Sequence, residues 1–331
     1  MRSTNIEQVA SEIFRIEMPM KNLALKSVNL YVIRGLEKNL IIDTGLDREE
    51  CFKIILDGVK ALGINLQITD LFITHMHGDH IGLVEKMWTP HNEVYLNRLE
   101  IETIRNFLGF DPIIKYRIKH GFPREKVKTA TERFRVDTDS IVRRGKLDYH
   151  SVDNWDQIKI NDKRFICIHT PGHSKGHTCL YEPNEKILIS GDHILGDITP
   201  GIECISDKTN PLSSYLKSLA EVKKLDLSII LPGHRSLIRD PLKRINELEE
   251  HHQKRLEEII QILNGSPGTA YYVASKMKWD LPYKSWNEVP DDQKWFAVGE
   301  AISHLRYLED QGMVKRNGDS KTVVFNITED S

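Results

Sequence analysis

The stretch THMHGDH, residues 74–80, contains four side chains of the kinds that bind metal ions. They are the imidazoles of His75, His77 and His80 and the carboxylate of Asp79. Zinc and similar first-row metals take such ligands. Four of them within six residues cannot all bind one tetrahedral ion and leave a coordination position open. The stretch therefore predicts two metal ions, and Gly78 allows the backbone to turn tightly between the ligands.

Three further candidate ligands, His173, Asp192 and His234, each follow a predicted β-strand. Those strands cover, in the same order, residues 163–168, 186–190 and 227–231. Another predicted strand, residues 70–74, runs directly into His75. Loops at strand ends are where a rigid scaffold collects side chains from distant parts of a sequence. We therefore interpret all seven side chains as parts of one site.

This pattern resembles the metallo-β-lactamase superfamily. The matching motifs keep the family's order and spacing along roughly residues 10–240: THMHGDH at 74–80, PGH at 171–173, GD at 191–192 and PGH at 232–234. The resemblance implies an α/β fold, the αββα metallo-β-lactamase sandwich, with the metal ions at one edge.

The resemblance also implies a role for each ligand. The first metal ion is expected on His75, His77 and His173, the second on Asp79, His80 and His234, with Asp192 bridging the two. Asp79, His80 and Asp192 are also the residues expected to be catalytic. The Asp43-Thr44-Gly45 turn is similar to the family's, in which this aspartate supports the metal-binding loop. We predict two divalent ions, zinc, with iron and manganese as alternatives that such ligands also accept.

The remaining histidines near these motifs are expected to play lesser parts. His177 is similar to the second histidine of the family's PGHSxGH element, which leaves open whether it supports the site, contacts the substrate or only packs. His169 and His193 are expected to support the site or to pack in the core rather than to bind metal.

Composition indicates an ordinary globular protein. The chain has 331 residues, of which 40% are hydrophobic and 28% charged, with a net charge of −2. This length suits one large domain and a small one. Its four cysteines form no C-x-x-C pair, so we expect reduced core thiols. The sequence has no apolar run long enough for a signal peptide or a membrane span, and we expect a cytoplasmic enzyme.

We predict a catalytic domain over residues 1–240 and a second part over residues 241–331. The second part begins with a long amphipathic helix, residues 239–263, which packs on the core or forms the seam of a homodimer. Two helices and a hairpin around Asn317-Gly318-Asp319 follow. The order helix, helix, hairpin is that of a winged helix.

A basic helical insertion is predicted at about residues 98–150. Between Arg98 and Lys146 there are 13 basic and 7 acidic residues, a net charge of +6. One interpretation is a solvated helical face. The other is a lid or wall that receives an anionic substrate.

The winged-helix-like tail is similar to the domain found in one branch of the superfamily, which includes endoribonucleases and thioesterases that act on acyl carriers. A nucleic-acid reader would need a basic recognition helix. The helix predicted from Phe296 to Gln311 is net acidic, which argues against nucleic acid as the partner. True β-lactamase activity is not expected, since the chain has no export signal and no cysteine at a ligand position.

The leading hypothesis is therefore a binuclear metal-dependent hydrolase in which a metal-bridging hydroxide attacks an anionic small-molecule ester or thioester of the acyl-CoA type. The first alternative is a metal-dependent endoribonuclease that cleaves single-stranded RNA. The second is a non-catalytic metal- or nucleic-acid-binding protein, against which the complete ligand set argues.

Overall fold

The protein is described from a computed structural model that covers residues 5–20, 25–132, 138–317 and 321–328. Its internal contacts divide the chain into two compact units. The first comprises Met1–Phe107, Ile141–Pro200 and Ser218–Ile245, and the second Leu108–Ser140, Gly201–Lys217 and Asn246–Ser331. These units are defined by contacts, whereas the predicted boundary at residue 240 concerns parts that fold on their own, and it stays a prediction.

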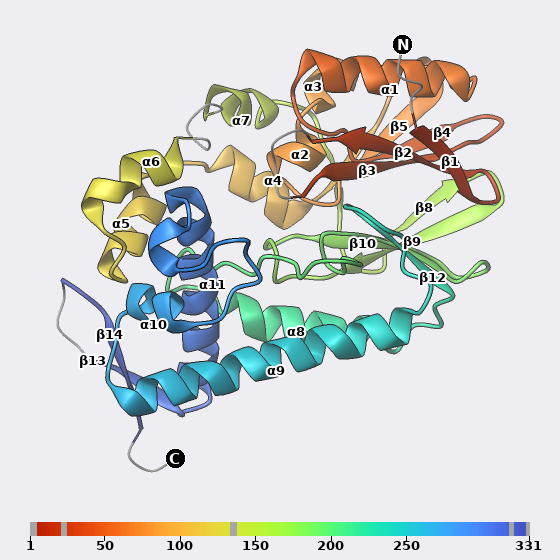
Figure 1. Ribbon diagram of the computed structural model, residues 1–331. Coiled ribbons are helices and arrows are strands. Elements are labelled where there is room, and N and C mark those ends of the chain that lie inside the picture. The colour runs from red at the N-terminus through yellow and green to blue at the C-terminus, as the bar shows by residue number, and fades with distance from the viewer. Residues whose placement is uncertain (1–4, 21–24, 133–137, 318–320, 329–331) are drawn as a thin grey trace. The chain divides into compact units, whose positions relative to one another are not determined.

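Two β-sheets form the centre of the first unit (Figure 1). The described strands of the first sheet run in chain order: β1 (Asn5–Ala10), β2 (Ile13–Pro19), β3 (Ser27–Ile33), β4 (Asn39–Ile42), β5 (Thr69–Phe72), β6 (Val94–Asn97) and β7 (His150–Val152). The second sheet has the order β12 (Ile229–Pro232), β11 (Ile187–Gly191), β10 (Thr178–Glu182), β9 (Lys163–His169) and β8 (Gln157–Ile160). β3 and β4 pair antiparallel.

Alternating side chains of β3 build the two faces of the first sheet. Val28, Leu30 and Val32 pack in one core cluster with Cys51 and Ile55 of α1 (Glu49–Ala61). On the opposite face, Tyr31 and Ile33 pack in a second cluster with Phe165 and Leu180 of the other sheet. Successive side chains of a strand point to opposite faces, so one strand faces a helix layer and a sheet layer at once.

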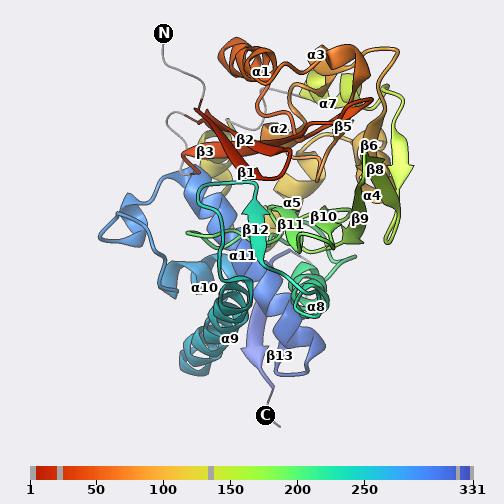
Figure 2. The ribbon, with the colours of Figure 1, turned by 90° about the vertical axis from the view of Figure 1, so that its right-hand side faces the viewer.

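Figure 2 shows the same layers from the side, with α1 beyond one sheet and α8 (Pro211–Val222) beyond the other. The part of α8 from Ser218 onward belongs to the first unit. The predicted αββα metallo-β-lactamase sandwich is confirmed.

A break separates the two short helices that follow β5. These helices are α2 (Gly78–Ile81) and α3 (Val84–Met87). The Leu83 N–H donates to Thr44 Oγ1 at 3.1 Å instead of continuing the helix. A Cβ at Gly82 would lie 2.5 Å from the Asp47 nitrogen, so the break lies where the chain packs against a neighbouring turn.

The second unit is mainly helical. Its described elements include α5 (Asp111–Lys119), α6 (Val127–Thr131), most of α9 (Pro241–Gly265), α10 (Ala270–Lys276), α11 (Asp291–Asp310), β13 (Val314–Asn317) and β14 (Val324–Ile327). α11 contacts α5, α6, α10 and β13. β13 and β14 pair antiparallel, as the predicted hairpin requires, but its turn at residues 318–320 lies outside the described residues. The winged-helix assignment stays a prediction.

The helical stretch over residues 98–150 contributes to both units. α4 (Arg98–Arg105) lies in the first unit and α5 and α6 in the second. In the second unit, Arg117 is fully buried and donates to Glu203, and Lys126 lies 3.4 Å from Asp291. Part of the positive charge predicted for this stretch is therefore neutralised inside the unit.

All four cysteines are buried free thiols, which confirms the predicted core positions. No helix among the described residues combines the length and apolar character that crossing a bilayer requires.

Candidate metal centre

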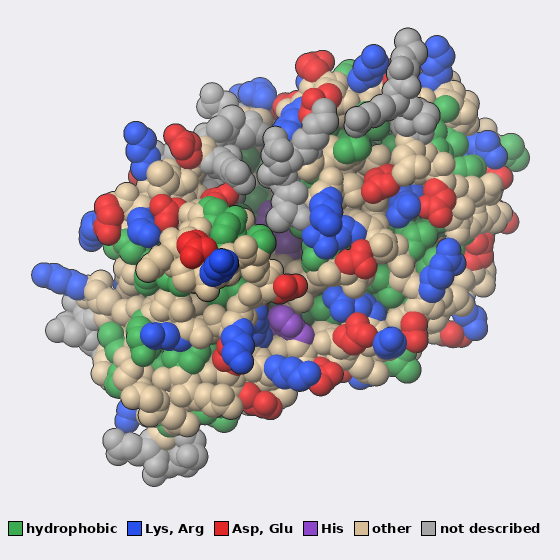
Figure 3. All heavy atoms as spheres, viewed as in Figure 1, with side chains coloured by type: hydrophobic (Ala, Val, Ile, Leu, Met, Phe, Trp, Pro, Cys, Tyr) green, Lys and Arg blue, Asp and Glu red, His purple; other side chains and the backbone are tan. Residues whose placement is uncertain are grey.

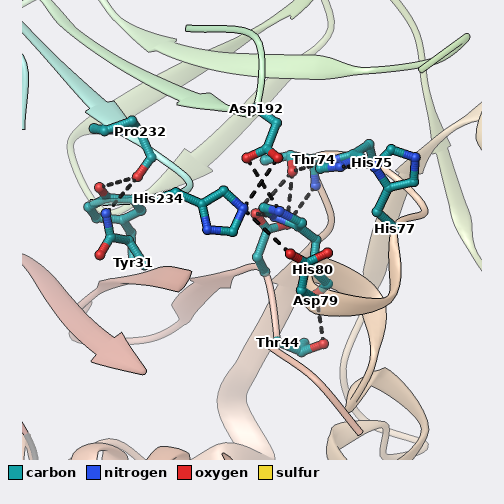
Figure 4. A network of polar contacts seen from close by, with 12 residues as sticks. Tyr31, Thr44, Thr74, His75, His77, Asp79, His80, Asp192, Pro232 and His234 are labelled. Carbon is teal, nitrogen blue, oxygen red and sulfur yellow. Dashed lines mark hydrogen bonds and ion pairs between the residues drawn. The ribbon is translucent and has the colours of Figure 1, made fainter. Parts of the chain in front are cut away.

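The seven predicted ligands come from the ends of strands in both sheets of the first unit, and all of them except His173 are labelled in Figure 4. His75, His77, Asp79 and His80 follow β5, and His173 lies on the loop between β9 and β10. Asp192 follows β11 directly, and His234 lies two residues beyond β12. The sandwich therefore brings together residues that are up to 159 positions apart in the sequence, from His75 to His234.

Three overlapping groups of these side chains could each hold a metal ion. They are His75 with His77 and His173, His75 with His80 and Asp192, and Asp79 with His80 and His234. Within each group the potential ligand atoms lie within 4.8 Å of one another. Every one of the seven predicted residues belongs to at least one group, so the structure brings the whole predicted set together.

In the first group the ring nitrogens converge closely. His77 Nδ1 lies 3.0 Å from His75 Nε2 and 2.8 Å from His173 Nε2, and the two Nε2 atoms are 3.2 Å apart. These three imidazole nitrogens face one point. A cation bound there would stabilise the arrangement, whereas protonation of all three imidazoles would destabilise it. Burial lowers the pKa of His77 to about 3 and that of His75 well below its ordinary value, with the neighbouring His173 adding to the effect. Neutral imidazoles are the form that binds metal.

On the other side of the site, hydrogen bonds settle which nitrogen is left for a ligand. His80 Nδ1 lies 2.7 Å from Asp43 Oδ2, and His234 Nδ1 lies 2.6 Å from the Ser27 carbonyl oxygen. Both partners are acceptors, so each Nδ1 donates and each Nε2 is the nitrogen left to bind a metal ion. His80 Nε2, His234 Nε2 and Asp192 Oδ1 are buried without a hydrogen-bond partner among the described residues.

Buried polar atoms are normally paired, and an unpaired group calls for an explanation such as an ion. These three unpaired atoms are all lone-pair donors and all turn toward the same place (Figure 4). His80 Nε2 and His234 Nε2 lie 3.4 and 3.3 Å from oxygens of Asp192. The donor set therefore fits a divalent cation.

Carboxylates concentrate negative charge on this side. Although burial opposes it, the Asp192 carboxylate raises the pKa of His80 and of His234. Burial likewise opposes ionisation of Asp192, but the His234 and His80 imidazoles hold its pKa well below the ordinary value. These imidazoles thus favour the ionised form of Asp192, and in a metal-bound site an ion would take the place of the imidazole protons.

Asp43 supports the metal-binding loop as the turn at 43–45 suggested. Its carboxylate accepts hydrogen bonds from the Thr74 N–H at 2.8 Å and the Thr74 hydroxyl at 2.9 Å, besides that from His80. Its φ is +63°, a conformation that a non-glycine residue adopts at a cost of about 1–3 kcal/mol. The contacts to Thr74 and His80 offset that cost.

His177 is a buried supporting residue rather than a ligand. Its Nε2 accepts a hydrogen bond from the Asp192 N–H at 3.1 Å, and its Nδ1 lies 2.8 Å from Thr170 Oγ1. Because Nε2 is the acceptor, the proton lies on Nδ1 and is donated to Thr170. Burial, with help from the nearby His193, holds the pKa of His177 well below its ordinary value. His169 and His193 also lie outside the three ligand groups.

Residues that fix the loops carrying the ligands are not apparent from the sequence. Tyr31 Oη and Asn29 Nδ2, both on β3, donate to the Pro232 carbonyl oxygen at 2.8 and 3.0 Å, two residues before His234. Glu100 on α4 accepts hydrogen bonds from two other ligand loops. Tyr31 and Asn29 are part of an apolar-looking strand, so their partners become visible only when the two sheets are packed together.

Comparison with known proteins agrees with this fold and site. The model of the metallo-beta-lactamase superfamily matches residues 24–234, and the chain belongs to that superfamily. The matched range contains all seven candidate ligands.

Two relatives and one solved structure resemble nearly the whole chain. The probable metallo-hydrolase YqjP of Bacillus subtilis is 22% identical over 95% of this chain and 97% of its own length. The atrochrysone carboxyl ACP thioesterase of Passalora fulva is 26% identical over 99% of this chain and 85% of its own. The crystal structure of metallo-beta-lactamase family protein TTHA1429 from Thermus thermophilus superposes with a TM-score of 0.80 at 25% identity, covering 97% of this chain and 100% of that one.

Proposed function

We propose that the protein is a binuclear metal-dependent hydrolase that cleaves an anionic small-molecule ester or thioester, of the acyl-CoA type. The observation that carries the proposal is the convergence of seven ligand side chains with three buried, unpaired donor atoms. His75, His77 and His173 would hold one divalent ion, and Asp79, His80 and His234 the other, with Asp192 between them. When bound, two such ions supply a water-derived nucleophile at neutral pH and polarise the oxygen of the electrophile.

The side chains of the chain itself would then have separate tasks. In the metal-bound protein, His80 and His234 would bind through Nε2, because their Nδ1 atoms donate to Asp43 and to Ser27. Asp192, whose backbone N–H is held by His177, supplies a fixed negative charge that balances the cations. Asp79 is the more open carboxylate of the site, with 16% of its side chain exposed against 8% for Asp192.

Thioesters are favoured as substrates by the relative from Passalora fulva, which is named as an acyl-carrier thioesterase. An acyl carrier and coenzyme A both present a thioester on a phosphate-bearing arm. Lys115, Arg124 and Lys128 of the second unit are exposed cations. Zinc is the ion that this ligand set suits best, with iron and manganese as the other candidates.

RNA is less favoured because cations of the tail already have partners. Arg306 of α11 is paired with Glu309, and Arg316 of β13 with Glu309 and Asp207. On the face shown in Figure 3, Lys and Arg side chains are interspersed with Asp and Glu side chains. A protein that tracks a nucleic-acid backbone presents a continuous basic stripe.

The test is thiol release from acyl-CoA and acyl-glutathione thioesters, with protein of measured zinc, iron and manganese content. Metal-stripped protein and His80→Ala serve as controls. We expect metal-dependent release from at least one acyl class. If protein carrying two ions per chain releases no thiol from any of them, the thioester proposal is wrong, and single-stranded RNA becomes the substrate to assay.

A further inference from the structure

Glu100 is a fully buried carboxylate whose charge is held by backbone N–H groups. Its Oε2 accepts from the Met76 N–H at 3.0 Å, and its Oε1 accepts from the Gly176 N–H at 2.5 Å. Charge-assisted hydrogen bonds of this kind are short and strong, and leaving a buried carboxylate without them is costly. Both oxygens are engaged and neither is exposed, so Glu100 has no access to a substrate.

The two N–H groups belong to two different ligand loops. Met76 stands between His75 and His77, and Gly176 follows His173 by three residues. The first of these loops leaves β5 in one sheet, and the second joins β9 to β10 in the other. A single carboxylate thus ties together the backbone segments that carry all three members of one ligand group.

The first turn of α4 is shaped to receive the second loop. Asn97 caps the helix by accepting from the Leu99 N–H at 2.9 Å, and its Nδ2 donates to Thr178 Oγ1 at 3.3 Å. A Cβ at Gly176 would lie 2.8 Å from both Asn97 Oδ1 and Glu100 Cγ. Glycine is therefore required at position 176 because the loop backbone lies directly against this turn.

The other ligand group is held by separate contacts. His80 is fixed by Asp43, and the segment that carries His234 is fixed by the hydrogen bonds of Tyr31 and Asn29 to the Pro232 carbonyl oxygen. None of these contacts involves Glu100, so the two halves of the site have different supports.

We propose that Glu100 is a positioning residue that selectively builds the metal site of His75, His77 and His173, while Tyr31 supports the site that contains His234. The proposal rests on the binuclear centre proposed above. It requires that the binding of each ion can be weakened separately by changes in residues that bind no metal.

The experiment compares two buried isosteric variants, Glu100→Gln and Tyr31→Phe, by zinc content after dialysis against buffers of graded free zinc. The glutamine amide presents N–H to one of the two backbone donors, so one of the loops loses its anchor. We expect Glu100→Gln to bind one ion about 10–100-fold more weakly and the other as the wild type does. Tyr31→Phe, which leaves Asn29 in place, is expected to weaken one ion by about 2–10-fold.

The identity of the affected site is read in a His77→Ala background, in which the first site is already disabled. There, Glu100→Gln should cause no further weakening of the remaining ion, whereas Tyr31→Phe should still weaken it. Thermal unfolding of the metal-free proteins shows how much stability each variant loses. A loss of stability alone would not weaken the binding of one ion and spare the other. If Glu100→Gln fails to fold, Glu100→Asp takes its place, since it keeps the charge but is too short to reach both loops.

Equal weakening of both ions by Glu100→Gln, or further weakening of the ion that remains in the His77→Ala protein, would overturn the role of Glu100. Unchanged zinc binding by Glu100→Gln would overturn it too. Failure of the binuclear centre would be distinguished by the wild-type protein. If the wild type binds fewer than two zinc ions, the binuclear centre itself is contradicted, and the positioning role with it.

Discussion

Replacing Asp43 by asparagine tests how the fold selects the nitrogen that His80 offers to a metal. The Asp43 carboxylate accepts from His80 Nδ1 at 2.7 Å and from the Thr74 N–H at 2.8 Å, and only 2% of the residue is exposed. An asparagine keeps the shape but has one acceptor and one donor group. If its oxygen stays on Thr74, its NH2 faces His80 Nδ1 and forces that nitrogen to be an acceptor. The His80 proton then moves to Nε2, the atom that the second ion would need.

The size of the effect follows from the lost interaction. A hydrogen bond to a charged group contributes about 1.5–3 kcal/mol, and about 1.4 kcal/mol corresponds to a tenfold change in affinity. We therefore expect Asp43→Asn to bind the second ion about 10–100-fold more weakly, which is also the range typical of lost support around a metal ligand. Zinc affinity is measured by competition with a chromophoric chelator, and stability by urea unfolding of the metal-free protein.

Asp70→Asn is the matched control. Asp70 is also a buried carboxylate of the first unit, and it accepts from the Glu93 N–H at 2.8 Å and pairs with Lys38 at 2.6 Å, but it contacts none of the candidate ligands. The Asp70→Asn variant should lose stability without losing zinc affinity. Wild-type zinc affinity in Asp43→Asn, or equal losses of affinity in both variants, would refute the reasoning about the His80 tautomer.

Three further predictions use other parts of the structure. His80→Ala and Asp79→Ala should each lose the second ion and nearly all turnover, as measured by metal content and thiol release; a wild-type rate in either would mean that the ligand assignment is wrong. Gly233→Ala should weaken metal binding, since a Cβ there would lie 2.5 Å from Asp192 Oδ1. Unchanged zinc affinity would contradict this and show that the loop shifts to accommodate the Cβ. In the second unit, burial raises the pKa of Glu300 to about 7 from 4.5, with Arg255 opposing the shift and Glu203 adding to it. The folded state then binds more protons than the unfolded state between these values, so the free energy of unfolding should fall by roughly 1–3 kcal/mol as the pH rises through this window. Urea unfolding of Glu300→Gln should lack that fall, and an identical pH dependence in both proteins would contradict the shift.

The candidate ligands could be picked out from the sequence because their chemistry is local. Four of them stand within six residues, and each of the other three follows an apolar run that ends at a glycine-containing turn. The residue types indicate metal binding, and their positions at strand ends indicate that the side chains lie close together. The fold class followed from the same motifs, since their order is that of the superfamily to which the chain belongs.

Glu100 shows what the sequence could not reveal. In the segment Arg98-Leu99-Glu100-Ile101-Glu102, the two glutamates look alike. Glu102 forms an exposed pair with Arg98 at 2.7 Å, whereas Glu100 is fully buried against two loops. The difference comes from which side of α4 meets residue 176, and that contact joins positions 76 apart in the chain.

The basic stretch shows the same limit for charge. Arg117 counts as a free cation in the sequence, yet it is fully buried, donating to the Cys204 carbonyl oxygen at 2.7 Å and paired with Glu203. A net charge of a segment says nothing about acidic partners that lie elsewhere in the chain. The helices of residues 98–144 were foreseen, but their division between the two units was not, because helical periodicity does not specify which neighbour a helix packs on.

The most direct test of the account is the rate of thioester hydrolysis as divalent metal is added stepwise to metal-free protein. The substrate is the thioester released fastest in the panel, and bound metal per chain is measured at each step. We predict no turnover without metal and a rate that rises until two ions are bound per chain. A plateau at one ion, or turnover by the metal-free protein, would contradict a binuclear metal-dependent hydrolase.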